Sequence, residues 1–114
     1  MTNPNFMTGV PEFLILRLLQ RQEMYGYELV QAIRAATRDA IKLSEGVVYP
    51  SLHALERQGA LKSRRKSVNG RTRVYYAVTA KGTKHLTGLS SDWNRIANAL
   101  QNVAKEIPNV SSAL

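Results

Sequence analysis

Residues 44–58 read SEGVVYPSLHALERQ, and this stretch decides the fold of the chain. Three apolar residues recur along it at helical spacing: Val48, Leu52 and Leu55. That spacing predicts an amphipathic helix with one buried face. Ser44 suits the N-cap position just before the helix, and Gly59 suits the left-handed position just after it.

Pro50 falls inside this predicted helix. If the helix starts just after Ser44, Pro50 lies beyond the first turn and removes one intrahelical hydrogen bond. The sequence is compatible with a bend near the N-terminal end of the helix, and also with a helix that begins nearer Tyr49. Both alternatives stay open at this point.

The segment that follows carries most of the excess positive charge. The chain has 16 basic and 8 acidic residues, which gives a formal net charge of +8. Six of the basic residues and none of the acidic ones lie in residues 62–73. A basic excess in one short segment implies a polyanionic partner. The alternative is a solvated segment that binds nothing.

A β-hairpin is the structure predicted for this basic segment. Asn69-Gly70 is a strong signal for a two-residue turn. In residues 74–78, side chains alternate in the pattern of a half-buried strand, and residues 61–66 are the natural antiparallel partner. The tip of this hairpin is polar and basic, so it is suited to meet water or phosphate.

A helix that starts with small and hydroxylated residues and is followed by a basic hairpin is typical of a DNA-binding winged helix-turn-helix. The expected major-groove or phosphate contacts on the helix are Ser44, Gly46, Tyr49, Ser51 and His53. The expected phosphate or minor-groove contacts on the hairpin are Arg64, Arg65, Lys66, Arg71 and Arg73. Tyr25 and Tyr27 are expected to contact the DNA backbone. For Tyr49, packing in the core is the alternative.

Two more helices are predicted before this unit. Thr8 and Pro11 suit the start of the first, whose residues 13–19 are apolar almost all round and must be covered on two sides. Residues 24–36 predict the second, with Gly26 near its start permitting close approach of a neighbour. Its expected inner face consists of Leu29, Ala32, Ile33 and Ala36. Residues 41–43 could form a short strand.

The last predicted helix is capped by Thr79 and runs toward Pro108. Its apolar residues are spaced alternately by three and four positions: Leu86, Leu89, Trp93, Ile96, Leu100, Val103 and Ile107. This period is typical of a coiled-coil seam, so we predict a homodimer that binds a near-palindromic DNA site. The alternative is a helix that lies across its own domain. The expected dimer interface consists of Leu14, Leu18, Leu86, Leu89, Trp93, Ile96, Leu100 and Val103.

These elements predict a mainly α fold with a small β-hairpin (α+β), in the form of a winged helix-turn-helix with a long C-terminal dimerisation helix. Residues 8–79 are expected to form the DNA-binding domain and residues 80–107 the dimerisation helix. Residues 1–7 and 108–114 are expected to be flexible tails.

Composition argues against several other classes of protein. The chain has no cysteine, which removes disulfides and thiolate metal sites. No apolar run reaches the roughly 18 residues of a membrane span, and no secretory signal is evident, so we expect a cytoplasmic protein without a membrane partner. His53 and His85 have no partner at metal-ligand spacing. We therefore expect no enzyme activity, no metal and no cofactor.

Four motifs, in this order and spacing, resemble the PadR family of bacterial transcriptional regulators in its short-chain subgroup. They are YGYEL at 25–29, GVVYPSL at 46–52, LERQG at 55–59 and RTRVYYAVT at 71–79, followed by Gly82. The resemblance implies a repressor that releases DNA when a small aromatic or cationic compound binds. It also implies an effector site at Trp93, which matches a Trp that some multidrug-sensing members place at the dimer centre. The alternative is that Trp93 only fills space.

Two other binding functions remain open. A protein-interaction adaptor that keeps a winged helix without reading DNA would favour a neutral or acidic hairpin. RNA binding would favour an exposed aromatic platform. Tyr75 is one possible exposed aromatic residue, whereas Tyr76 is expected to face the core. The basic hairpin favours double-stranded DNA.

Overall fold

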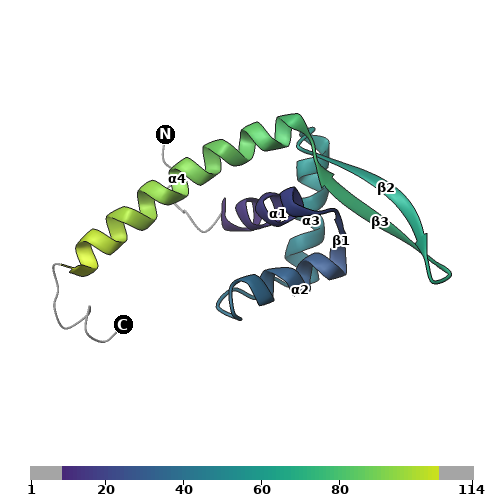
Figure 1. Ribbon diagram of the computed structural model, residues 1–114, viewed down its shortest axis with the longest axis horizontal. Coiled ribbons are helices and arrows are strands. Elements are labelled where there is room, and N and C mark those ends of the chain that lie inside the picture. Colours follow the sequence, from purple (N-terminus) through teal and green to yellow (C-terminus); the bar gives the residue numbers. More distant parts are fainter. Residues whose placement is uncertain (1–8, 106–114) are drawn as a thin grey trace.

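The computed structural model describes residues 9–105, which form four helices and three strands (Figure 1). In chain order these are α1 (Val10–Arg21), β1 (Met24–Tyr25), α2 (Gly26–Ala36), α3 (Glu45–Arg57), β2 (Leu61–Val68), β3 (Arg71–Val78) and α4 (Ala80–Lys105). This is a winged helix-turn-helix followed by a long helix, as predicted. The expected cap Thr8, the expected tails and the seam residue Ile107 lie outside the described residues.

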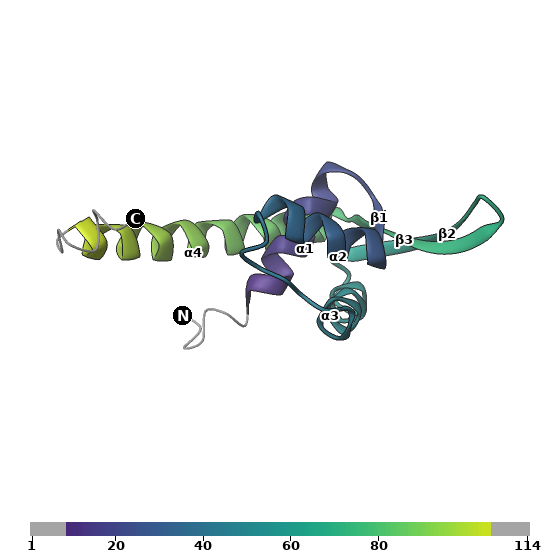
Figure 2. The ribbon, with the colours of Figure 1, turned by 90° about the horizontal axis from the view of Figure 1, so that it is seen from below.

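One hydrophobic core joins α1, α2 and α3 to the inner face of the sheet. Its fully buried members are Ile15, Leu16, Leu29, Ile33, Val48, Leu52 and Leu55. The sheet contributes Met24, Leu61 and Tyr76. Figure 2 shows α3 nearly end-on, projecting from the body of the domain. Burial of one face of α3 therefore fixes this helix while its opposite face stays exposed.

The first turn of α3 settles the position of Pro50. The helix begins at Glu45, with Ser44 as an N-cap residue in extended conformation. The Ser44 carbonyl accepts the amide of Val48 at 2.9 Å, although the Ser44 side chain makes no capping hydrogen bond. The helix that starts just after Ser44 is therefore the correct alternative. Pro50 lies within it and removes one backbone hydrogen bond.

The C-terminal end of α3 is closed as predicted. Gly59 has a φ of 82°, in the left-handed region. The amide of Ala60 donates to the Leu55 carbonyl at 2.9 Å, and the amide of Gly59 donates to the Glu56 carbonyl at 3.0 Å. These two bonds form a Schellman-type cap. They turn the chain directly from α3 into β2, so the helix and the hairpin are held together.

The region between α1 and α3 differs from the prediction in three respects. Residues 24–36 are not one helix, because Met24–Tyr25 pairs with β3 and the helix starts only at Gly26. The predicted strand at 41–43 is absent, and β1 takes its place in the sheet. Ala36, the last residue of α2, is exposed rather than on the inner face. Strand pairing satisfies backbone groups that a helix would otherwise have bonded.

The predicted hairpin consists of β2 and β3, with Val68 opposite Arg71. Asn69 and Gly70 have φ angles of 53° and 78°, so both adopt the left-handed conformation that a two-residue hairpin turn requires. The strand order is β1-β3-β2. The hairpin extends well beyond the helices, and we call it the wing (Figure 1).

Thr79 caps α4 as predicted. Its Oγ1 accepts the amide of Gly82 at 3.0 Å and donates to the carbonyl of Gly59 at 2.6 Å. Gly82 has no room for a side chain, because the carbonyl oxygen of Ala60 lies against it. The start of α4 is therefore tied to the end of α3.

The apolar residues of α4 are divided between the chain's own domain and solvent. Leu86 is buried in the core, and Leu89 packs against it. Leu100 and Val103 are each 57% exposed, on the part of α4 that projects away from α1 (Figure 1). The expectation of one uniform seam is thus corrected: Leu86, and Leu18 of α1, are buried within the chain itself. No helix among residues 9–105 is both long and apolar enough to cross a membrane.

Candidate nucleic-acid interface

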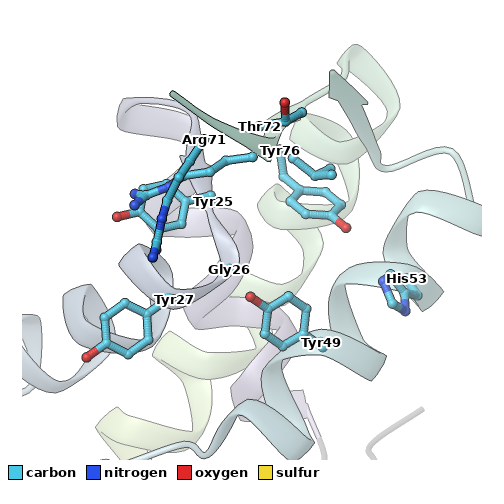
Figure 3. A pocket seen from close by; sticks show the side chains of 10 residues that line it. Tyr25, Gly26, Tyr27, Tyr49, His53, Arg71, Thr72 and Tyr76 are labelled. Carbon is cyan, nitrogen blue, oxygen red and sulfur yellow. The ribbon is translucent and has the colours of Figure 1, made fainter. Parts of the chain in front are cut away.

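An open cleft of about 570 Å³ lies between the start of α2, α3 and the N-terminal half of β3 (Figure 3). β1 pairs with only the 75–76 part of β3, so residues 71–74 keep a free edge within the described chain. Six residues that line the cleft are predicted DNA contacts: Tyr25, Tyr27, Tyr49, His53, Arg71 and Arg73. Gly26, Thr72, Val74 and Tyr76 complete the lining. Tertiary structure therefore gathers three separate motifs around one groove.

Aromatic rings hold two of the wing's cations in place. The guanidinium carbon of Arg73 lies 4.2 Å from the ring centre of Tyr25. The rings of Tyr25 and Tyr75 meet edge to face, with their centres 5.4 Å apart. Nζ of Lys66 lies 4.9 Å from the ring centre of Tyr75. Cation–π contacts of this kind orient a charge without neutralising it.

The tyrosines of the cleft differ in their surroundings. The ring of Tyr49 is half-buried against Gly26, and its centre lies 6.4 Å from that of His53. Tyr27 is 49% exposed, and its hydroxyl accepts a hydrogen bond from Nε2 of Gln31 at 2.9 Å. Both phenol groups border the groove (Figure 3). Tyr49 therefore packs against the core and also borders the groove, and its contact with DNA stays a prediction.

The base of the wing is fastened to α3. Oγ of Ser63 donates to Oε2 of Glu56 at 2.6 Å. Tyr76 is buried nearby, and burial raises the pKa of its phenol, as does the negative charge of Glu56. The phenol therefore stays protonated at neutral pH. The angle between α3 and the wing is set by these contacts and by the Schellman-type cap.

Glu23, just before β1, pairs with two of the wing's cations. Arg64 donates to both carboxylate oxygens, with Nε 3.0 Å from Oε1, and Nζ of Lys66 lies 3.8 Å from Oε2. The hydrogen bond from Arg64 lowers the pKa of the Glu23 carboxyl. The same hydrogen bond to Glu23 raises the pKa of the Arg64 guanidinium. Sequence reasoning missed Glu23, because it lies 41 positions from Arg64.

The five predicted wing cations are therefore not equivalent. Arg65 lies opposite Val74, and directly opposed residues share one face of a sheet. Arg65 thus belongs to the face of the cleft residue Val74, whereas Arg64 and Lys66 belong to the other face, together with Arg71 and Arg73. Arg64 and Lys66 therefore differ from Arg71 and Arg73 in their ionic partners, not in the face of the sheet. Among residues 9–105, no salt bridge involves Arg65, Arg71 or Arg73.

The exposed face of α3 extends further than predicted. Ser44 and Gly46 are exposed at its start, as expected for residues that approach DNA. An outward stripe at helical spacing consists of Gly46, Pro50, His53 and Arg57, all exposed. The prediction omitted Pro50 and Arg57, although their spacing from Gly46 and His53 could have identified them.

Ser51 does not belong to this stripe. Its hydroxyl donates to the carbonyl of Val47 at 2.8 Å. Its side chain lines a second cleft beside Pro11 of α1 and Leu89 of α4. The structure therefore separates Ser51 from Tyr49 and His53, which line the first cleft from a different side of the helix.

Trp93 lies at the junction of α4 and α1. Its ring is half-buried and stacks on Phe13, with ring centres 6.2 Å apart and planes 28° apart. Leu14, the next residue of α1, is partly buried against the core. Ile96 is half-buried one turn further along α4. An aromatic pair therefore lies where the projecting part of α4 leaves the domain.

Several proteins are similar to this chain in sequence, and two of them match it over most of both chains. A transcriptional regulator of Mycobacterium tuberculosis is 33% identical over 102 residues, which cover 90% of this chain and 86% of that protein. An uncharacterized protein of Lysinibacillus sphaericus is 28% identical over 97 residues, which cover 84% of this chain and 89% of that protein.

Solved structures of transcriptional regulators are similar to this chain in fold. A transcriptional regulator from Clostridium thermocellum has a TM-score of 0.78 at 25% identity, covering 90% of this chain and 97% of that one. A PadR family transcription regulator from Clostridium difficile has a TM-score of 0.70 at 28% identity. The match covers 83% of this chain and 98% of that one. The model of the transcriptional regulator PadR-like family matches residues 15–88, well over half of the sequence. This chain therefore belongs to the PadR-like family of transcriptional regulators.

Proposed function

We propose that this chain is a sequence-specific DNA-binding repressor that acts as a homodimer and releases DNA when a small aromatic or cationic compound binds. The observation that carries the proposal is the open cleft that unites six predicted contacts from β1, α2, α3 and β3. Phenol, imidazole and guanidinium groups bind phosphates and base edges. Membership of a transcriptional-regulator family, which is not an enzyme class, supports this use of the cleft.

In the proposed complex, α3 enters the major groove. The small residue Gly46 and the compact Pro50 allow close approach, and His53 and Arg57 reach the base edges or phosphates from the same stripe. The wing meets the adjacent phosphates or minor groove, with Arg65, Arg71 and Arg73 as its contacts. Tyr25 of β1 and Tyr27 at the start of α2 contact the DNA backbone.

Residues 8–79 form the DNA-binding domain in this proposal, and residues 80–107 form the dimerisation helix. Leu100 and Val103 support it, because two apolar side chains stand 57% exposed on a projecting helix. A two-fold pairing of α4 would bury them and place two copies of α3 about one DNA turn apart. The binding site would then be a near-palindromic operator.

The effector is proposed to bind beside Trp93. The ring pair of Trp93 and Phe13 supports this, since flat compounds stack on such rings and cationic ones gain a further attraction. An inserted compound would shift α4 against α1 and so alter the spacing of the two copies of α3. The effector and the DNA would then favour different positions of α4, and this difference couples effector binding to DNA affinity.

The test compares fluorescently labelled DNA and RNA duplexes of one sequence by anisotropy, followed by selection from a random DNA library. We expect tighter binding to DNA, a strong salt dependence and a selected site with two-fold symmetry. Equal affinity for both duplexes would overturn DNA recognition. Absence of binding to either would favour the protein-interaction adaptor.

A further inference from the structure

Both carboxylate oxygens of Glu23 are occupied by the wing. Arg64 forms a two-pronged contact with them, through Nε at 3.0 Å from Oε1 and through Nη2 to Oε2. Nζ of Lys66 lies 3.8 Å from the same Oε2. Two of the five cations predicted to contact DNA therefore share one intramolecular counterion.

The sheet register explains why this contact forms. Tyr25 of β1 lies opposite Tyr75 of β3, which lies opposite Arg64 of β2. These three residues form one row on one face of the sheet. Glu23 immediately precedes β1 and lies two positions before Tyr25, so its side chain is on the same face and reaches the cations there. The Glu23 side chain is only 28% exposed, whereas that of Arg64 is 61% exposed.

A carboxylate and a phosphate compete for the same donors. Both are anions that present two oxygens to the planar fork of an arginine. DNA must therefore displace Glu23 before Arg64 and Lys66 can each take a phosphate. A cation that is already neutralised releases fewer counterions from DNA and adds less to sequence-independent affinity.

We propose that Glu23 is a specificity-determining residue that holds Arg64 and Lys66 away from DNA phosphates and so weakens binding to DNA of arbitrary sequence. The inference rests on the proposed DNA-binding function. Arg65, Arg71 and Arg73 then supply the phosphate contacts of the wing. Weaker binding to arbitrary DNA raises the ratio of specific to non-specific affinity, which is the quantity that matters against an excess of competing sites.

Glu23→Gln is the informative substitution, because it keeps the size of the side chain and removes its charge. The probe is a labelled mixed-sequence DNA duplex, and anisotropy is measured over a series of salt concentrations. We expect roughly 5- to 10-fold tighter binding at about 0.1 M salt. The log–log salt slope becomes more negative by about 0.9 for each phosphate gained. Asp92→Asn is the matched control, since it removes a carboxylate whose arginine partner, Arg95, lies at 3.6 Å on α4.

A double-mutant cycle shows whether Glu23 acts through these two cations. In a chain carrying Arg64→Ala and Lys66→Ala, Glu23→Gln should no longer tighten binding. A gain that persists there would overturn the inference, because Glu23 would then repel DNA directly. Unchanged or weaker binding by Glu23→Gln alone, while the unaltered protein binds DNA, would also overturn it and leave the proposed function intact. If the unaltered protein binds no DNA, both proposals fail.

Discussion

The ring of Tyr49 lies directly against the backbone of Gly26, where a Cβ would overlap the ring carbons and the hydroxyl. This contact joins the first residue of α2 to the exposed helix α3, and both residues line the cleft. Gly26 is not among the residues with positive φ, so the requirement is for space rather than for an unusual backbone. The position of one candidate DNA contact thus depends on the absence of a side chain.

Gly26→Ala should displace the Tyr49 ring, because a Cβ would overlap it and overpacking of this kind costs about 1–3 kcal/mol. We expect the displaced ring to weaken DNA binding by roughly tenfold, or about 1.4 kcal/mol. The helix preference of alanine, up to about 1 kcal/mol, should offset only part of that cost in stability. Anisotropy and urea unfolding would separate the two effects. Gly88→Ala, where a Cβ meets nothing within 4 Å, is the control and should leave DNA affinity unchanged.

Tyr49→Phe distinguishes packing from a hydroxyl contact. The ring remains against Gly26 in both variants, so the fold should be unaffected. If the hydroxyl bonds a phosphate, DNA affinity should fall by about 1 kcal/mol, or roughly fivefold. Binding measurements with the selected operator would decide this, and unchanged affinity would assign Tyr49 to packing alone.

Replacing Arg71 and Arg73 together by alanine should flatten the salt dependence of DNA binding. Neither side chain forms a salt bridge within residues 9–105, so both are available to phosphates. Loss of two phosphate contacts per protomer should make the log–log slope less negative by about 1.8 per protomer. Circular dichroism would check the hairpin, and an unaltered slope with an intact hairpin would show that the wing does not touch DNA.

Leu100→Asp combined with Val103→Asp should convert the proposed dimer into monomers. Both side chains are 57% exposed in the single chain, so the substitutions should leave the domain folded. Burial of four carboxylates in a two-fold interface would be strongly unfavourable. Light scattering coupled to a sizing column gives the mass. A stable dimer in this variant would place the interface elsewhere.

Trp93 is the only tryptophan of the chain, so its fluorescence reports on one site. Planar cationic dyes should quench this emission and weaken DNA binding in the same concentration range. Trp93→Phe keeps an aromatic ring beside Phe13 and should bind the dyes less well, while Trp93→Ala should lose their effect on DNA. The effector proposal fails if no dye quenches the emission, or if quenching dyes leave DNA affinity unchanged.

Local signals in the sequence were sufficient for most of the fold. The caps at Ser44 and Gly59, the turn at Asn69-Gly70 and the cap at Thr79 all lie where they were predicted. Each depends on one or two residues and on a period of apolar side chains, so neighbours in the chain decide it. The two-residue strand β1 was missed because its pairing with β3 is a contact between distant segments.

The candidate site, too, was predicted in part from the sequence and decided in part by the tertiary structure. The sequence by itself determined which residues carry charge and hydroxyl groups, and it predicted the six that meet in the cleft. Only the tertiary structure decided that Ser51 lines a second cleft beside α1 and α4, that Leu86 is buried in the chain's own core, and that Glu23 pairs with Arg64. The reason is geometric: a residue's chemistry is fixed by its type, but its neighbours across a sheet or between helices are set by register and packing.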